Sequence, residues 1–233
     1  MSTHLSRKEL KQDNVALKVE ETRHFLVEHR EAAIKAGIAV VIVLAIGFGS
    51  WFFVNSRKQA RQQALANAIE LENAPVGAAN PNGGPSFPTD AAKNAAVQSA
   101  LKSVMAEGSE EGYAAEYYLA GINASNGKTD EALKGYDHVA SNAGADYASL
   151  AKLAKAQLLF SLNKSSEAQA ILKDLMDHPT AMVSKDQAAM TLAQGIASTQ
   201  PEEARKLLLP IASEHSDVSQ AAVTALGDLP AAK

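Results

Sequence analysis

The sequence predicts an all-α protein in which one N-terminal transmembrane helix is followed by an α-solenoid of helical hairpins. Three observations lead to this fold class. Residues 36–54 form an uncharged apolar run, only 5% of the 233 residues are aromatic, and a local pattern recurs at a spacing of 36 residues between Ala132, Ala168 and Ala204. Alanine is abundant, and alanine-rich, aromatic-poor sequence favours closely packed helices over sheets.

Residues 1–35 are predicted to form a charged cytoplasmic helix ahead of the apolar run. Ser6 and Glu9 have the spacing of a capping box, and residues 8–33 contain neither glycine nor proline. Their apolar positions form only a loose stripe. This pattern favours a solvated helix that continues into the span, and a cytoplasmic docking segment is the alternative.

Residues 36–54 are predicted to be the transmembrane helix. As a helix, a run of this length spans roughly 28 Å, close to the ~30 Å thickness of a bilayer core. A cleaved signal peptide fits poorly, because a long charged region precedes the run and the run exceeds the usual signal core. Phe48, Trp51, Phe52 and Phe53 gather at one end, as in an interfacial aromatic belt.

The charges around the span predict its orientation. Seven lysines and arginines precede the run, and three follow it within about twenty residues. This bias predicts a single-pass topology with the amino terminus in the cytoplasm and residues 55–233 on the far side of the membrane. In a diderm bacterium the membrane would be the inner membrane and the far side the periplasm. Two pairs of small residues, Ala33 with Gly37 and Ala45 with Gly49, are candidates for helix contacts within the membrane.

The chain after the span is predicted to contain a juxtamembrane helix, a loop and a repeat domain. Residues 55–72 continue the helical pattern. Residues 73–90 hold four prolines and three glycines, which predicts a linker or loop. A helix restarts with Thr89 or Asp90 as its N-cap. The repeat domain extends over residues 91–226, and residues 227–233 form a tail.

The repeat consists of a helix, a tight turn that ends in Glu-Ala, and a second helix. Small or apolar residues recur twelve positions before each alanine of the Glu-Ala pair, and apolar residues recur four and seven positions after it. Small residues allow paired helices to approach closely, and large ones fill the interface with the next hairpin. The predicted packing positions are Ala120, Ala132, Tyr136, Ala156, Ala168, Leu172, Ala204 and Leu208.

At these residues the chain resembles the tetratricopeptide repeat, over about 110 residues. Gly127 stands where that family has its turn glycine, whereas Asn163 and Thr199 occupy the equivalent positions in the next two hairpins, and Leu192 replaces a small residue. The resemblance implies a solenoid that binds other proteins.

The whole arrangement resembles the ancillary subunits of the bacterial Sec translocon: a short charged head, one N-terminal span and a small helical-repeat domain. This resemblance implies a role in Sec-dependent protein export or periplasmic chaperoning, with translocon subunits, a periplasmic chaperone and exported chains as partners. Residues 36–54 would contact the lipid bilayer. A structural scaffold or adaptor for an envelope-assembly, division or secretion complex is the alternative.

The first helices of the hairpins are predicted to line a concave face. A groove with tyrosine and leucine side chains would suit an extended or helical peptide. For Leu150 and Leu153 the alternative is an ordinary place in the core. The candidate groove residues are Tyr117, Gly121, Leu150, Leu153, Gln157, Asp186 and Ala189.

The sequence contains no pattern typical of an enzyme. It has no cysteine, and a formal net charge of −4 gives no basic footprint for nucleic acid. Gly127-Lys128-Thr129 lacks the glycine that a phosphate-binding loop needs at Ile122. The six histidines are scattered without metal-ligand spacing. We therefore expect no catalytic residue, cofactor, metal or small-molecule substrate.

Overall fold

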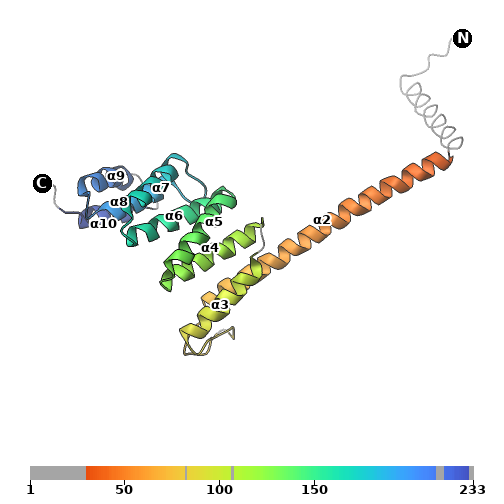
Figure 1. Cartoon of the computed structure of the whole chain (residues 1–233), viewed down its shortest axis with the longest axis horizontal. Helices are drawn as coiled ribbons and strands as arrows, with labels where there is room; N and C mark the ends of the chain where they lie inside the picture. Colours follow the sequence, from red (N-terminus) through yellow and green to blue (C-terminus); the bar gives the residue numbers. More distant parts are fainter. Residues whose placement is uncertain (1–29, 82, 106–107, 214–217, 231–233) are drawn as a thin grey trace, which may run out of the picture. The chain divides into compact units, whose positions relative to one another are not determined.

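The computed structural model describes residues 30–81, 83–105, 108–213 and 218–230, with side chains from residue 41 onward. The described residues form helices and no β-strand beyond one isolated bridge, which agrees with the predicted α-solenoid (Figure 1). The chain divides into two units, Met1–Gln59 and Ala60–Lys233. The helices are α2 (Arg30–Glu72), α3 (Asp90–Val104), α4 (Glu110–Ser125), α5 (Thr129–Asn142), α6 (Ala145–Ser161), α7 (Ser165–Asp177), α8 (Lys185–Ile196), α9 (Pro201–Ser213) and α10 (Ser219–Asp228).

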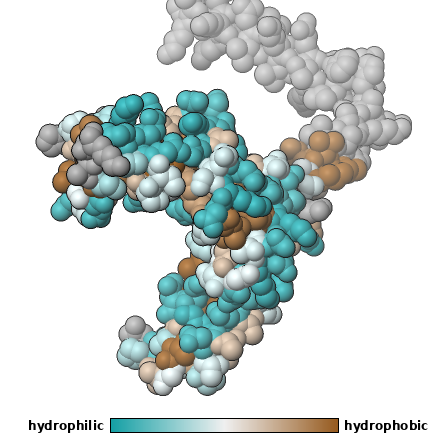
Figure 2. All heavy atoms as spheres, turned by 60° about the vertical axis from the view of Figure 1, so that its left-hand side comes forward, coloured by the Kyte–Doolittle hydropathy of each residue, from teal (hydrophilic) through white to brown (hydrophobic). Residues whose placement is uncertain are grey.

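The described part of the first unit belongs to α2 and exposes apolar side chains all round. More than half of each is open to solvent, and Figure 2 shows part of this stretch as a block of hydrophobic residues. The exposed residues are Val41, Ile42, Val43, Leu44, Ile46, Phe48, Trp51, Phe52, Phe53 and Val54. The guanidinium of Arg57 lies 4.5 Å from the ring centroid of Phe53. Within the described residues, no helix combines the length and the apolar character that crossing a membrane requires.

Several predictions for the amino-terminal part lie outside what the structure describes. The head is outside it up to residue 29, and so are the side chains at Ala33 and Gly37. Ala45 is exposed, and a Cβ at Gly49 would meet no atom within 4 Å, so both face open space in the described chain.

Helix α2 continues without a break to Glu72, so residues 55–72 are helical as predicted. The loop that follows is closed at its base. The amide of Gly77 donates to the carbonyl of Phe87 at 2.9 Å, and the amide of Phe87 donates to the carbonyl of Pro75 at 3.0 Å. Helix α3 then starts at the predicted cap, because the side chain of Thr89 accepts a hydrogen bond from the amide of Ala92 at 3.2 Å.

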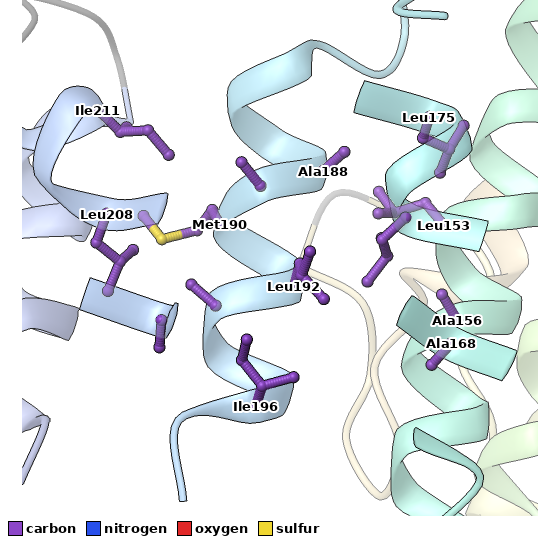
Figure 3. Packing of buried hydrophobic residues seen from close by; sticks show 14 of the residues in the cluster. Leu153, Ala156, Ala168, Leu175, Ala188, Met190, Leu192, Ile196, Leu208 and Ile211 are labelled. Atoms are coloured by element: carbon purple, nitrogen blue, oxygen red, sulfur yellow. The ribbon is translucent and has the colours of Figure 1, made fainter. Parts of the chain in front are cut away.

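The three predicted hairpins are present as α4–α5, α6–α7 and α8–α9. All eight predicted packing positions are buried, and the largest of them, Tyr136, is 5% exposed. Figure 3 shows how α8 joins two neighbours: Leu192 points toward Leu153 of α6, whereas Met190 points toward Leu208 of α9. Each hairpin therefore buries its apolar positions against the next one.

The turns inside the first two hairpins share one backbone conformation. Gly127 and Asn163 have φ of 72° and 59°, and Asn163 is the one described non-glycine residue with positive φ. Asparagine adopts this left-handed region more readily than most residues, so it replaces glycine here. The third turn is built differently: the amides of Thr199 and Gln200 both donate to the carbonyl of Ile196, and Pro201 opens α9. Proline is favoured at that first helical position.

A fourth hairpin precedes the three predicted ones. The last turns of α2 pack with α3 and α4 in a core cluster that contains Ala68, Val97, Leu101 and Val104. The three residues of α3 have the spacing of four and seven positions found in the later hairpins, and Ala68 is the buried small residue of the first helix. The sequence pattern did not predict this hairpin.

Helix α10 closes the array by packing on α9. Leu229 is 9% exposed within the same core as Leu208. A nitrogen of the Arg205 guanidinium donates to the carbonyl of Pro230 at 2.9 Å. The packed chain therefore extends beyond residue 227, where the sequence predicted the tail to begin.

Candidate functional site

The first helices of neighbouring hairpins touch one another along one side of the array. Helix α4 contacts α6, and α6 contacts α8. The last turns of α2 join this side, because Arg61 lies opposite Glu111 of α4, with Nε and Oε2 3.5 Å apart. We call this side, formed by α2 from Ala60 onward, α4, α6 and α8, the inner wall.

The inner wall contains a pocket of about 290 Å³, here called the inner pocket. It combines apolar and acidic side chains, and Met182 beside α8 is 50% exposed. Elsewhere the visible face of the array is mostly hydrophilic, with hydrophobic residues in small separate patches (Figure 2). The pocket is lined by Gln62, Leu65, Glu110, Glu111, Asp146, Tyr147 and Met182.

The carboxylates of the inner pocket come from the starts of two helices. Glu110 and Glu111 lie in the first turn of α4, and Asp146 lies in the first turn of α6. Acidic residues stabilise this end of a helix through its dipole, so local helix energetics explain why they gather here. Glu111 is only 7% exposed, with Arg61 opposite it. The pocket has three carboxylates and one neighbouring guanidinium, so its net charge is negative.

The tyrosine in this pocket is neutral at ordinary pH. Burial raises the pKa of Tyr147, and the neighbouring Tyr118, Glu110 and Glu111 raise it further. Its hydroxyl therefore stays protonated and can donate a hydrogen bond. The pocket offers apolar contact, hydrogen bonding and negative charge together, which suits a peptide that carries apolar and basic side chains.

A second pocket of about 290 Å³ opens where the α2–α3 hairpin meets the α4–α5 hairpin, and we call it the tyrosine pocket. The ring centroid of Tyr117 lies 5.6 Å from that of Tyr118 and 5.9 Å from that of Tyr136. Tyr118 is 40% exposed, whereas Tyr136 is buried. The lining consists of Glu72, Asn94, Tyr117, Tyr118, Gly121, Ile122, Ser125, Asn126 and Tyr136.

The structure separates the predicted groove residues into several environments. Tyr117 and Gly121 line the tyrosine pocket. Leu153 and Ala189 are 6% and 5% exposed and lie in the core between α6 and α9. Packing between hairpins covers them, so they do not line an open face.

The other three predicted groove residues lie outside both pockets. Leu150 is half-buried and packs against the same core as Leu153, so the core alternative describes both leucines. Gln157 of α6 is exposed, and Asp186 in the first turn of α8 is half-buried.

The sequence pattern did not predict the accessible side chains of Tyr118, Tyr147 and Met182. In Tyr117-Tyr118 one ring packs inward and the other outward, since adjacent helical residues point about 100° apart. The tyrosine pair could therefore have predicted one accessible aromatic ring. Met182 lies in the connection between α7 and α8, where no periodic pattern marks its direction.

No protein-family model matches the chain, and the searches of curated proteins and of solved structures gave no match either. In the part of the chain that the structure describes, no group of three or more histidine, aspartate or glutamate side chains could hold a metal ion.

Proposed function

We propose that this protein is a membrane-anchored, tetratricopeptide-like module that binds other proteins as an accessory of Sec-dependent export or periplasmic chaperoning. The observation that carries the binding role is the inner pocket. It opens in the wall formed by the first helices of the hairpins, where apolar Leu65 and Met182 lie beside carboxylates. Such a surface binds a peptide segment through apolar contacts and charge.

The sequence of residues 36–54 supports the anchor. Its uncharged run has the length of a bilayer core, and the described part of it exposes every large apolar side chain. Arg57 lies over the ring of Phe53 at the end of the run, a pairing that suits the membrane interface. In the proposed topology the array lies in the periplasm and residues 1–35 lie in the cytoplasm.

Attachment to the membrane would allow a surface of weak affinity to bind its partners effectively. Confinement to a membrane raises the effective concentration of the module near partners in the same membrane. A pocket of about 290 Å³ is small for a ligand site, so modest affinity for segments of translocon subunits, a chaperone or exported chains is expected.

Site-specific crosslinking tests the binding role. A photoreactive residue replaces Met182, which is exposed at the inner pocket, and a matched control replaces Val223, which is 56% exposed on α10. We expect the probe at residue 182 to capture many different exported chains together with translocon subunits, and the control to capture few. One stoichiometric envelope partner at residue 182 would instead identify a structural scaffold.

Protease accessibility tests the anchor and its orientation. In intact spheroplasts, added protease should digest residues beyond the span and leave the head protected. The chain should also stay with the membrane fraction after alkaline extraction. Protection of the array while the head is cut would invert the topology, and release into the soluble fraction would contradict the anchor.

A further inference from the structure

We propose that the tyrosine pocket binds the guanidinium group of an arginine side chain presented by a partner protein. This inference rests on the proposed function in one respect, since it takes the ligand to be a protein. It assigns a defined chemistry to a site separate from the inner pocket. Three kinds of group around the pocket, aromatic rings, a carboxylate and helix ends, each favour a cation.

The aromatic rings form the first part of the argument. The planes of Tyr117 and Tyr118 are tilted by 69° in an edge-to-face arrangement, and those of Tyr117 and Tyr136 by 52°. In an edge-to-face pair one ring covers a face of the other, so at least one of the two rings keeps both faces free of this contact. Ring faces carry partial negative charge and attract cations, arginine more often than lysine. Tyr118, 40% exposed, is the ring most open to such a ligand.

The ionised and polar groups around the rings also favour a bound cation. Glu72 has a carboxylate, and Asn94 and Asn126 have side-chain amides whose oxygens can accept hydrogen bonds. Helices α2 and α4 both end at this pocket, at Glu72 and Ser125. The C-terminal end of a helix carries partial negative charge, so two such ends strengthen the attraction for a cation.

The described lining of the pocket contains no positively charged side chain that would repel a cation. None of the described residues that line the pocket is a lysine, arginine or histidine. The volume of about 290 Å³ lies at the lower limit for small-molecule sites, which fits one inserted side chain better than a cofactor. Guanidinium is planar, stacks on aromatic faces and has five donors, which match acceptors spread around the rim better than an ammonium does.

The test uses the full chain in detergent micelles and three capped tripeptides that differ only at the central residue: Gly-Arg-Gly, Gly-Lys-Gly and Gly-citrulline-Gly. Citrulline has the shape of arginine without its charge. Binding is followed by NMR through the ring signals of the tyrosines. We expect the arginine peptide to shift the signals of Tyr117 and Tyr118 with an affinity on the order of millimolar, the lysine peptide to bind more weakly, and the citrulline peptide to leave them unchanged.

Two variants and a matched control place the binding in this pocket. Tyr118→Ala and Glu72→Gln should each weaken arginine binding about two- to fivefold. Glu131→Gln, an exposed glutamate of α5 outside the pocket, should leave it unchanged. Because Glu72→Gln is nearly isosteric, it remains informative if Tyr118→Ala fails to fold. Equal binding of the arginine and citrulline peptides, or no effect of Glu72→Gln, would overturn the proposal.

The outcomes separate this inference from the proposed function. Crosslinking of exported chains at residue 182 without arginine binding at the tyrosines would overturn the inference alone. Arginine binding without any client crosslinked at residue 182 would support the pocket and contradict the proposed export role.

Discussion

Gly195 sets how closely α8 can lie against α6. A Cβ built at this position would overlap the ring of Phe160. Glycine in a helix costs about 1 kcal/mol relative to alanine, so the packing of this ring explains why a small residue stands here. A methyl group at residue 195 would therefore have to displace the ring of Phe160 or push the two helices apart.

Gly195→Ala should destabilise the protein by about 1–3 kcal/mol, because overpacking outweighs the gain in helix propensity. Chemical denaturation followed by circular dichroism measures the change. Gly121→Ala is the matched control, since its Cβ would lie 3.6 Å from the hydroxyl oxygen of Tyr136, an ordinary contact. That control should be neutral or stabilising by up to about 1 kcal/mol. Equal stability of the two variants would contradict this account of Gly195.

Tyr136 should make the array sensitive to alkali. Burial raises the pKa of Tyr136 to about 12, and the neighbouring Tyr117 adds to the rise. An unfolded tyrosine ionises near pH 10, so the folded state holds this proton more tightly. The associated stability is present below pH 10 and is lost as the pH rises from 10 through 12. In Tyr136→Phe, denaturation curves should lose part of their pH dependence in this window. An unchanged pH dependence would show that Tyr136 does not cause it.

At the scale of elements, the hairpin α2–α3 is the main finding beyond the sequence pattern. Its core residues Leu101 and Val104 are each 1% exposed, as deeply buried as Leu172 and Leu208 in the predicted repeats. The end of α2 therefore has a structural role in the array.

Leu101→Ala should cost about 2–5 kcal/mol, as expected for a leucine in a close-packed core. Leu172→Ala in the predicted repeat should cost a similar amount, and Lys102→Ala, an exposed neighbour, should change stability by about 0.5 kcal/mol or less. Urea denaturation measures all three. If Leu101→Ala behaved like Lys102→Ala, the α2–α3 hairpin would not contribute to the stability of the array.

The hairpins were predictable where their turns are short. Three residues separate α4 from α5 and α6 from α7, so buried positions recur at a fixed spacing. Seventeen residues separate α2 from α3. This longer connection interrupts the fixed spacing of buried positions, so the repeat pattern did not predict the α2–α3 hairpin. The surface was less predictable. Whether Leu153 faces a groove or a core depends on how α8 packs beside it, which helix periodicity alone does not encode.

At the scale of the whole molecule, the second unit holds the three hydrophobic core clusters found among the described residues. A fragment that starts at Ala60 should therefore fold alone and unfold cooperatively. Its melting by circular dichroism should resemble that of the array in the full chain. A fragment that starts at Asp90 removes Ala68 from its cluster and should melt at a lower temperature. Equal melting of both fragments would contradict the role assigned to α2.

The continuity of α2 has a mechanical consequence. The helix that carries the apolar run also supplies Ala68 to the first core cluster, and no loop lies between the two. Tension applied to the amino-terminal part of α2 would reach that cluster along a single helix. The force would then act on the packing of Ala68 against Leu101 and Val104. A force large enough to disrupt this packing would unfold the α2–α3 hairpin before the later hairpins.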